Sequence, residues 1–249
     1  MATVLITGAS SGFGKACALK FIDNGHKVIL AARREERIQA LVDKFGDNAM
    51  GITLDVRDRA AVFDAVEKIP LEFADINILI NNAGLALGLG GAQEADMDEW
   101  ETMVDTNVKG LMYLCRAVLP GMVERGGGHV VNLGSVAASW PYPGGNVYGG
   151  TKAFVQQFSR NLRVDLSGKN IRVSNIEPGM CETEFSVVRF SGDEEKAKQV
   201  YNGMKPLSAE DIAEIIYWTT SLPSHINVNQ LEVMPTAQSW SAFSVHREN

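Results

Sequence analysis

The sequence predicts a doubly wound α/β fold, in which helices cover both faces of a parallel sheet. Short apolar runs alternate with longer segments of helical periodicity along most of the chain. The short runs are continuously apolar rather than alternating, as expected for strands that are buried on both faces. A glycine-rich turn also lies between the first run and the first helical segment, where folds of this class bind ligands.

The predicted elements follow one another in regular strand and helix order. Strands are expected at residues 4–6, 28–31, 52–54, 76–80, 130–133, 171–176 and 231–233. Helices are expected at residues 15–23, 35–45, 60–68, 155–166 and 209–220, and residues 100–123 form one or two long helices. Irregular stretches at 85–96 and 178–205 each follow a predicted strand. Ligands of open parallel sheets bind beyond the carboxyl ends of the strands, so the site is expected beside these two loops.

Length and composition favour a single domain over residues 1–249. No repeat, low-complexity tract or linker divides the 249 residues. The net charge of −7 argues against nucleic acid or an anionic membrane as a partner. The three cysteines form no CxxC pair and the N-terminus lacks a cationic export signal, so a cytoplasmic protein without disulfides is expected. The four histidines have no metal-ligand spacing, and no metal site is predicted.

The glycine-rich turn is predicted to bind a dinucleotide. Glycines allow backbone N–H groups to approach a pyrophosphate, and the N-terminus of the following helix adds partial positive charge. Serine hydroxyls within the turn add further donors. The residues assigned to this role are Gly8, Ser10, Ser11, Gly12, Phe13 and Gly14.

The end of the second predicted strand indicates which dinucleotide binds. An acidic residue there would bind the ribose 2′-hydroxyl of NAD, but this chain has Arg33 and Arg34. Two guanidiniums suit a 2′-phosphate, so NADP is predicted. Asp55, followed by Val56, ends the third strand and has two compatible candidate roles, to cap the next helix and to accept a hydrogen bond from the adenine amino group.

A tyrosine and a lysine four residues apart carry the predicted chemistry. Tyr148 and Lys152 fall on one face of a helix, where an ammonium beside a phenol lowers the phenol pKa toward the range of a general acid or base. Ser135, just past a strand, offers a hydroxyl to a carbonyl oxygen. Asn107 places an amide inside a long helix, where it needs a partner.

Together these motifs resemble the short-chain dehydrogenase/reductase family over essentially the whole chain. The residues that carry the likeness are Gly8–Gly14, Asn81–Gly84, Asn107, Ser135, Tyr148, Lys152 and Pro178–Gly179. The resemblance implies a Rossmann-type domain and hydride transfer to or from a nicotinamide.

The resemblance also implies a role for each matching residue. Tyr148 would donate the proton, Lys152 would hold the ribose hydroxyls, and Ser135 would orient the carbonyl. Asn107 would anchor a water-borne proton relay. The remaining implied cofactor contacts are Asn82, Ala83 and Gly84 at the adenosine ribose, and Pro178, Gly179 and Thr183 at the carboxamide.

Within that family the chain is similar to bacterial NADP-dependent 3-hydroxy acid dehydrogenases. These enzymes interconvert serine, L-allo-threonine or 3-hydroxypropionate with the matching 3-oxo acids or semialdehydes. The residues that carry this likeness are 82–88, 140–149, 182–189 and the tail through Arg247. Sulfoacetaldehyde reductases are near neighbours, and the stretch at residues 182–185 occurs in both groups. Two further alternatives are a reductase of larger carbonyls, such as 3-oxoacyl thioesters, and a non-catalytic NADP-binding regulator.

A short acid substrate needs a cation near the reacting carbon, because burial of an unpaired anion is costly. Arg189 is the first cation after the loop that starts at Pro178, and Tyr142 adds a second donor to the same anion. The alternative is an ordinary surface arginine whose stem packs on a nearby phenylalanine.

The C-terminal tail, residues 234–249, is too apolar to be left in water. Phe243 is predicted to close the site, with stapling of an oligomer as the alternative. The resemblance predicts a homotetramer, which the apolar segments 100–123 and 155–166 favour.

Overall fold

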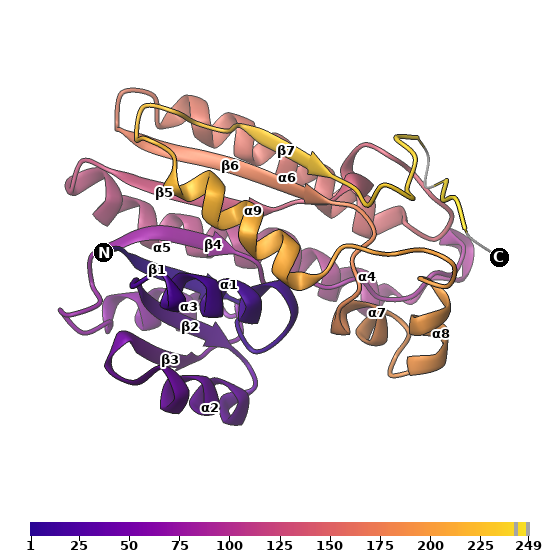
Figure 1. Ribbon diagram of the computed structural model, residues 1–249, viewed down its shortest axis with the longest axis horizontal. Coiled ribbons are helices and arrows are strands. Elements are labelled where there is room, and N and C mark those ends of the chain that lie inside the picture. The colour runs from indigo at the N-terminus through magenta and orange to yellow at the C-terminus, as the bar shows by residue number, and fades with distance from the viewer. Residues whose placement is uncertain (242–243, 248–249) are drawn as a thin grey trace.

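A computed structural model, which describes residues 1–241 and 244–247, confirms the doubly wound α/β fold (Figure 1). Within the described residues the sheet has seven parallel strands in the order β3-β2-β1-β4-β5-β6-β7. The strands are β1 (Thr3–Thr7), β2 (Lys27–Ala32), β3 (Ala49–Thr53), β4 (Ile76–Asn81), β5 (Gly128–Leu133), β6 (Ile171–Pro178) and β7 (Gln230–Val233). The order reverses between β1 and β4, and ligands of such sheets bind at this switch point.

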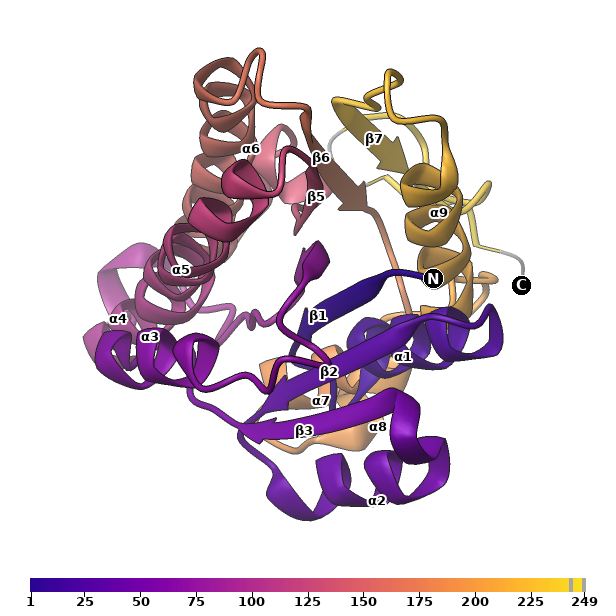
Figure 2. The same ribbon diagram turned by 90° about the vertical axis from the view of Figure 1, so that its left-hand side faces the viewer.

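Helices form a layer on each face of the sheet (Figure 2). They are α1 (Gly12–Asp23), α2 (Glu35–Phe45), α3 (Arg59–Glu67), α4 (Met97–Val104), α5 (Leu111–Glu124), α6 (Asn146–Asp165), α7 (Glu184–Arg189), α8 (Glu194–Gln199) and α9 (Ala209–Ser221). One core lies under α1, α2 and α9 and includes Phe21 and Ile216, whereas the other lies under α3, α5 and α6 and includes Leu114 and Val155. No helix in the described ranges has the length and apolar character to cross a membrane.

Several boundaries differ from the sequence prediction. β3 pairs with β2 from Ala49 onward rather than from residue 52. A Cβ at Gly51 would lie 2.6 Å from the Ile38 side chain, so this glycine lets α2 pack closely against the strand. α6 runs without a break from Asn146 to Asp165 and joins the helical turn predicted at Tyr148 and Lys152 to the helix predicted from residue 155, because the glycines between them hide the helical period.

The predicted long helix at residues 100–123 is divided by a π-helical turn. α4 and α5 are joined by the turn Asp105–Gly110, whose residues Thr106 and Asn107 are buried. A π turn shifts the register of the side chains and is frequent at functional sites. Asn107 therefore points inward from this turn rather than lying along a regular helix.

The predicted irregular loop at 178–205 contains α7 and α8. Each has only six residues, which is too short for a periodic signal. Figure 1 shows both helices beyond the ends of the strands, near the C-terminal segment.

Candidate active site

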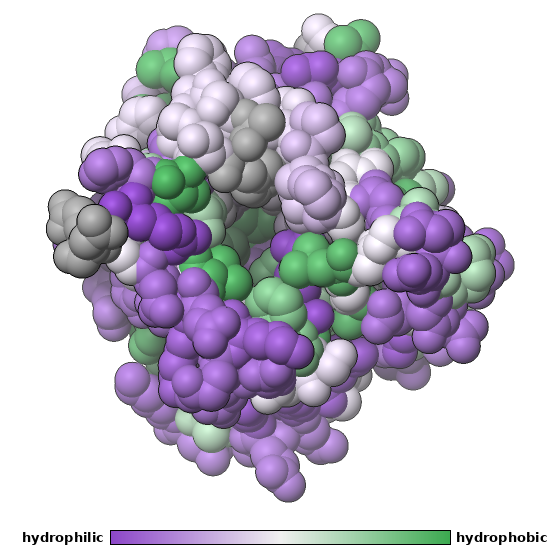
Figure 3. Space-filling view, turned by 90° about the vertical axis from the view of Figure 1, so that its right-hand side faces the viewer, coloured by the Kyte–Doolittle hydropathy of each residue, from purple (hydrophilic) through white to green (hydrophobic). Residues whose placement is uncertain are grey.

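The carboxyl ends of the strands border a pocket of about 290 Å³. Figure 3 views the end of the molecule to which the strands point and shows a hollow there beside hydrophobic residues. The predicted residues that line the pocket are Gly8, Ser10, Ser11, Gly12, Phe13, Arg33, Arg34, Asp55, Val56, Asn82, Ala83, Gly84, Tyr148, Lys152 and Thr183. The structure therefore brings most of the predicted cofactor residues and the Tyr148/Lys152 pair to one cavity.

The backbone of the glycine turn lines one side of this pocket. Gly8 and Gly12 have φ values of 65° and 50°, a backbone conformation that favours glycine. A Cβ at Gly14 would clash with the Gly8 carbonyl oxygen, so α1 starts close against the turn. Asn82 fixes the turn from β4, because its Nδ2 donates to the Thr7 carbonyl oxygen at 2.8 Å. The close approach of backbone and helix N-terminus fits the pyrophosphate of a dinucleotide.

Arg34 lies at one end of the pocket, against the serines of the glycine turn. Its Nε donates to Ser10 Oγ at 3.0 Å, and a terminal nitrogen donates to Ser11 Oγ at 2.6 Å. Arg33 is exposed and lines the same pocket. Guanidinium and hydroxyl groups are donors that suit a phosphate.

Asp55 lines the pocket but does not cap a helix. Its carboxylate accepts hydrogen bonds from the Arg57 guanidinium at 2.6–3.0 Å, and this hydrogen bond holds the pKa of Asp55 below its ordinary value. Asp58 caps α3 instead and accepts a hydrogen bond from Ala61 N, because Asp58 immediately precedes the helix. The capping alternative for Asp55 is thus wrong, and its carboxylate stays at the cavity beside Val56.

Lys152 is buried beneath the pocket and bound to the end of β5. Its Nζ donates to the Leu133 carbonyl oxygen at 2.7 Å and lies 5.8 Å from the centre of the Tyr148 ring. Burial lowers the pKa of Lys152 to about 8. The ammonium is therefore charged at neutral pH but loses its proton at a lower pH than an exposed lysine.

Tyr148 is buried, and burial raises the pKa of its phenol above the ordinary value. The Ser135 hydroxyl, as a hydrogen-bond partner, and the charge of Arg189 act in the opposite direction. The spacing with Lys152 predicts a lowered pKa for Tyr148, but the pKa is raised because burial outweighs the effect of the neighbouring groups. Tyr148 is consequently a protonated acid at neutral pH.

The Asn107 side chain forms hydrogen bonds with the loop after β4 and with α6. Its Oδ1 accepts from Leu85 N at 2.9 Å, and its Nδ2 donates to the Leu85 carbonyl oxygen at 2.8 Å and to Thr151 Oγ1 at 3.1 Å. A Cβ at Gly84 would lie 3.2 Å from Asn107 Oδ1 and 3.6 Å from Lys152 Nζ. Asn107 thus joins the loop after β4 to α6, next to Lys152.

Arg189, at the end of α7, lies between two tyrosines. One terminal nitrogen donates to the Tyr142 hydroxyl at 2.5 Å, and the Cζ atom is 5.1 Å from the Tyr142 ring centre and 5.7 Å from that of Tyr148. The Nε atom is buried and has no hydrogen-bond partner among the described residues. The guanidinium of Arg189 thus contacts tyrosines, and the alternative in which the stem of a surface arginine packs on a phenylalanine does not account for these contacts.

The loop after β6 is held from outside the pocket. Gly179 N donates to the Val233 carbonyl oxygen at 2.7 Å, next to Pro178 at the end of β6. Thr183 reaches the pocket, caps α7 by accepting from Phe185 N, and lies against Gly12.

Several predicted site residues do not line the cavity. They are Gly14, Asn107, Ser135, Tyr142, Pro178, Gly179 and Arg189.

The described part of the C-terminal tail packs on its own chain. Gln238 Oε1 accepts from Met180 N at 2.8 Å, and Trp240 Nε1 donates to Glu232 Oε1 at 3.0 Å. Phe243 lies outside the described residues.

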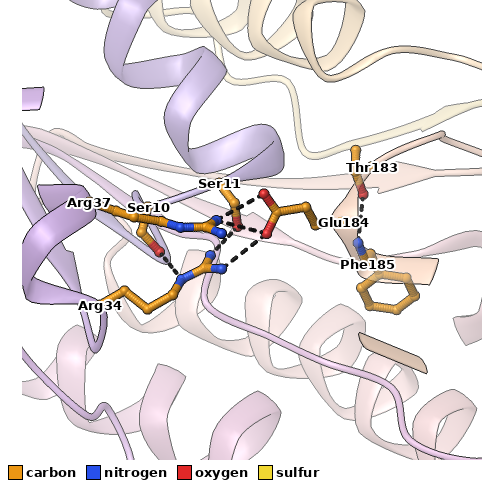
Figure 4. A network of polar contacts seen from close by, with 7 residues as sticks. All are labelled: Ser10, Ser11, Arg34, Arg37, Thr183, Glu184 and Phe185. Atoms are coloured by element: carbon orange, nitrogen blue, oxygen red, sulfur yellow. Dashed lines mark hydrogen bonds and ion pairs between the residues drawn. The ribbon is translucent and has the colours of Figure 1, made fainter. Parts of the chain in front are cut away.

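Two charged residues, the pocket-lining Glu184 and its partner Arg37, were not predicted from the sequence as site residues. Glu184, the first residue of α7, forms ion pairs with Arg34 and Arg37 (Figure 4). The pairs join positions 150 and 147 residues apart, so no local spacing indicates them. Phe185 is a third addition, since it lines the pocket with its ring centre 5.7 Å from that of Tyr148.

Known proteins resemble this chain in sequence and in structure. The family model described as short chain dehydrogenase matches residues 2–194. The NADP-dependent 3-hydroxy acid dehydrogenase YdfG of Salmonella typhimurium is 56% identical over 245 residues, which are 98% of this chain and 99% of that protein. Sulfoacetaldehyde reductase 2 of Chromohalobacter salexigens is 52% identical over 248 residues, which are 98% of each chain.

A solved structure of the closed form of serine dehydrogenase complexed with NADP+ has a TM-score of 0.95 and 55% sequence identity. The match covers 99% of this chain and 100% of that one. Family model, relatives and solved structure agree, and the chain belongs to the short-chain dehydrogenase family.

Proposed function

We propose that the protein is an NADP-dependent oxidoreductase that interconverts small 3-hydroxy acids with their 3-oxo acids or semialdehydes. The observation that carries this proposal is the buried Arg189 Nε, which has no partner among the described residues and lies in the guanidinium beside Tyr148. An unpaired buried guanidinium N–H is costly, and a substrate carboxylate would satisfy it. The names of the relatives support the same substrate class.

The cofactor preference follows from the donors at the pocket. Arg34, with Ser10 and Ser11, would hold the 2′-phosphate of NADP, and Arg33 would add a second cation. Lys152 would hold the nicotinamide ribose. The glycine turn would bind the pyrophosphate through its backbone and helix N-terminus.

The remaining residues perform the acid–base chemistry. When bound, the nicotinamide supplies or takes up the hydride. In reduction, Tyr148 gives its phenol proton to the carbonyl oxygen, which suits a phenol that burial keeps protonated at neutral pH. Ser135 donates a hydrogen bond to the same oxygen, and Arg189 with Tyr142 holds the acid group. Asn107 holds the loop after β4 through its hydrogen bond with Leu85 N. In this position it would anchor a water-borne proton relay beside Lys152.

A substrate panel tests this proposal. L-Serine, L-allo-threonine and 3-hydroxypropionate are assayed with NADP and with NAD by NADPH or NADH absorbance, and a neutral alcohol of equal length is the control. We expect turnover of the acids with NADP and little with the neutral alcohol. Equal kcat/KM for acids and neutral alcohols, or for the two cofactors, would contradict the proposal.

Reduction of sulfoacetaldehyde is a second candidate. A sulfonate accepts hydrogen bonds from the same Arg189 and Tyr142 donors, and the 52% identical relative from Chromohalobacter salexigens carries this name. Isethionate in the same panel distinguishes the two: a kcat/KM above that of every carboxylate would favour the sulfonate.

We also propose that the protein is a cytoplasmic homotetramer. Apolar side chains on α5 and α6 are exposed in the single chain, among them Met112 (39%), Phe154 (36%) and Val164 (72%). Such side chains are common at subunit interfaces. Light scattering at micromolar concentration tests the assembly, and a monomer would contradict it. Cell fractionation tests the location.

A further inference from the structure

Two arginines of α2 and its N-cap converge on one carboxylate from α7 (Figure 4). Arg34 donates from a terminal nitrogen to one Glu184 oxygen at 3.0 Å, and Arg37 donates to both Glu184 oxygens at 2.9 Å. Two guanidiniums around one set of anionic oxygens form an arrangement that also binds phosphate groups.

The Glu184 carboxylate lies at the end of the pocket where Arg34, Ser10 and Ser11 would bind the 2′-phosphate of NADP. Arg34 bonds Ser10 and Ser11 with two of its nitrogens and Glu184 with the third, so one guanidinium joins the glycine turn to α7. Glu184 and Arg34 both line the pocket. Burial acts to raise the pKa of Glu184, but the hydrogen bonds from Arg34 and Arg37 prevail and hold it below the ordinary value.

The ion pairs are suited to exchange of one anion for another. The side chains of Arg34, Arg37 and Glu184 are 43%, 49% and 49% exposed. Ion pairs this exposed contribute little net stability, so a stronger anion can replace the carboxylate. A phosphate monoester carries a charge of about −1.5 to −2 at neutral pH, compared with a single charge on a carboxylate.

We propose that Glu184 occupies the anion position of the 2′-phosphate site, that the 2′-phosphate of NADP displaces it from Arg34 and Arg37, and that Arg37 is thereby a specificity residue for this cofactor. The inference rests on the proposed NADP dependence. Because Glu184 begins α7, the exchange links occupancy of the phosphate site to the helix that carries Phe185 and Arg189. Both of these residues contact the Tyr148 ring, so the link reaches the proposed acid.

The first test removes the competing charge. Glu184→Gln keeps the size of the side chain, and dissociation constants for NADPH and NADH are measured by fluorescence titration. We expect NADPH to bind about two- to five-fold more tightly and NADH to bind as before, which is the range for exposed ion pairs. The matched control is Glu36→Gln, an exposed carboxylate in the first turn of α2. Weaker NADPH binding, or an equal change for both cofactors, would overturn the inference.

The second test removes the proposed phosphate ligand. Arg37→Gln is expected to weaken NADPH binding about ten-fold, the order of one charge-assisted contact, and to leave NADH unchanged. Arg59→Gln, an exposed arginine at the start of α3, is the matched control. Adenosine 2′,5′-bisphosphate and AMP serve as probes without nicotinamide, and only the bisphosphate should respond to Arg37→Gln.

These measurements separate the two proposals. Unmodified protein that binds NADH as tightly as NADPH would contradict the NADP assignment itself. Unmodified protein that prefers NADPH, with a preference that Arg37→Gln leaves intact, would contradict only the role of Arg37 and Glu184.

Discussion

The glycine turn after β1 and helix α7 both border the pocket, but they are held in place by different kinds of contact. The turn takes its shape from backbone geometry within seven residues, with glycines at Gly8 and Gly12 in a conformation that other residues rarely adopt, and Asn82 then holds it from the end of β4. The environment of α7 depends on side chains from distant segments, such as Arg189 with Tyr142, 47 residues away. A change in the turn should therefore disturb cofactor binding, whereas a change at the Arg189 end of α7 should alter substrate preference.

The largest expected effect concerns the proton donor. Tyr148→Phe removes one oxygen and leaves the buried ring in place beside Phe185. We expect kcat to fall by about 10²–10⁴, the usual contribution of a general acid or base, while NADPH binding changes less than about two-fold. Steady-state kinetics and fluorescence titration measure the two quantities.

The control for this prediction is Tyr113→Phe on α5, which removes a phenol outside the residues that line the pocket. Activity in Tyr148→Phe equal to that of the control would contradict the assignment of Tyr148.

The next effect concerns the substrate side. Arg189→Ala removes the guanidinium and is expected to raise KM for an acid substrate about ten- to hundred-fold, the range of charge-assisted hydrogen bonds. A neutral carbonyl substrate should be little affected, since it makes no ion pair. The exposed Arg160 on α6 provides the control substitution. Equal losses for charged and neutral substrates would place the anion site elsewhere.

The sequence predicts most of the strands and helices and the residues of the proposed cofactor site, because these depend on local patterns. Buried parallel strands need continuous apolar runs, so six of the predicted strands lie within observed ones and only the strand at residues 52–54 is displaced. The glycine turn and the Tyr148/Lys152 pair are local patterns, which a single sequence shows directly. Their placement at one pocket follows from the sheet topology.

The features that were missed depend on long-range contacts or on helix irregularities. Glu184 meets Arg34 and Arg37 only because the fold brings the start of α7 within side-chain reach of the start of α2, and no spacing encodes that contact. The π turn around Asn107 resembles an ordinary helix in its composition. The pKa direction of Tyr148 depends on burial, which the pattern of tyrosine and lysine does not reveal.

A smaller effect is expected from pH. Burial lowers the pKa of Lys152 to about 8, so its positive charge is present below that pH and is lost as the pH rises through it. NADPH, an anion, should bind several-fold more weakly at about pH 9 than at about pH 7 because this attraction is lost. Lys152→Arg stays charged over this range and should bind NADPH with the same affinity at both pH values. A decrease that persists in Lys152→Arg would assign the titration to another group.

The smallest predicted effect tests how the tail supports the loop after β6. Gln238 is buried and accepts a hydrogen bond from Met180 N at 2.8 Å, one residue after Gly179. Gln238→Ala leaves that N–H without its acceptor, which costs about 1–3 kcal/mol in unfolding free energy and lowers Tm by a few degrees. Because the loop leads to Thr183 at the pocket, KM for NADPH should rise about two- to three-fold with kcat nearly unchanged. Thermal unfolding and steady-state kinetics measure these changes, and the exposed Gln39→Ala on α2 is the control. A Tm and a KM equal to those of the control would mean that the tail does not position the loop after β6. The dependence on contacts between distant segments would then be confined to α7 and would not extend to this loop.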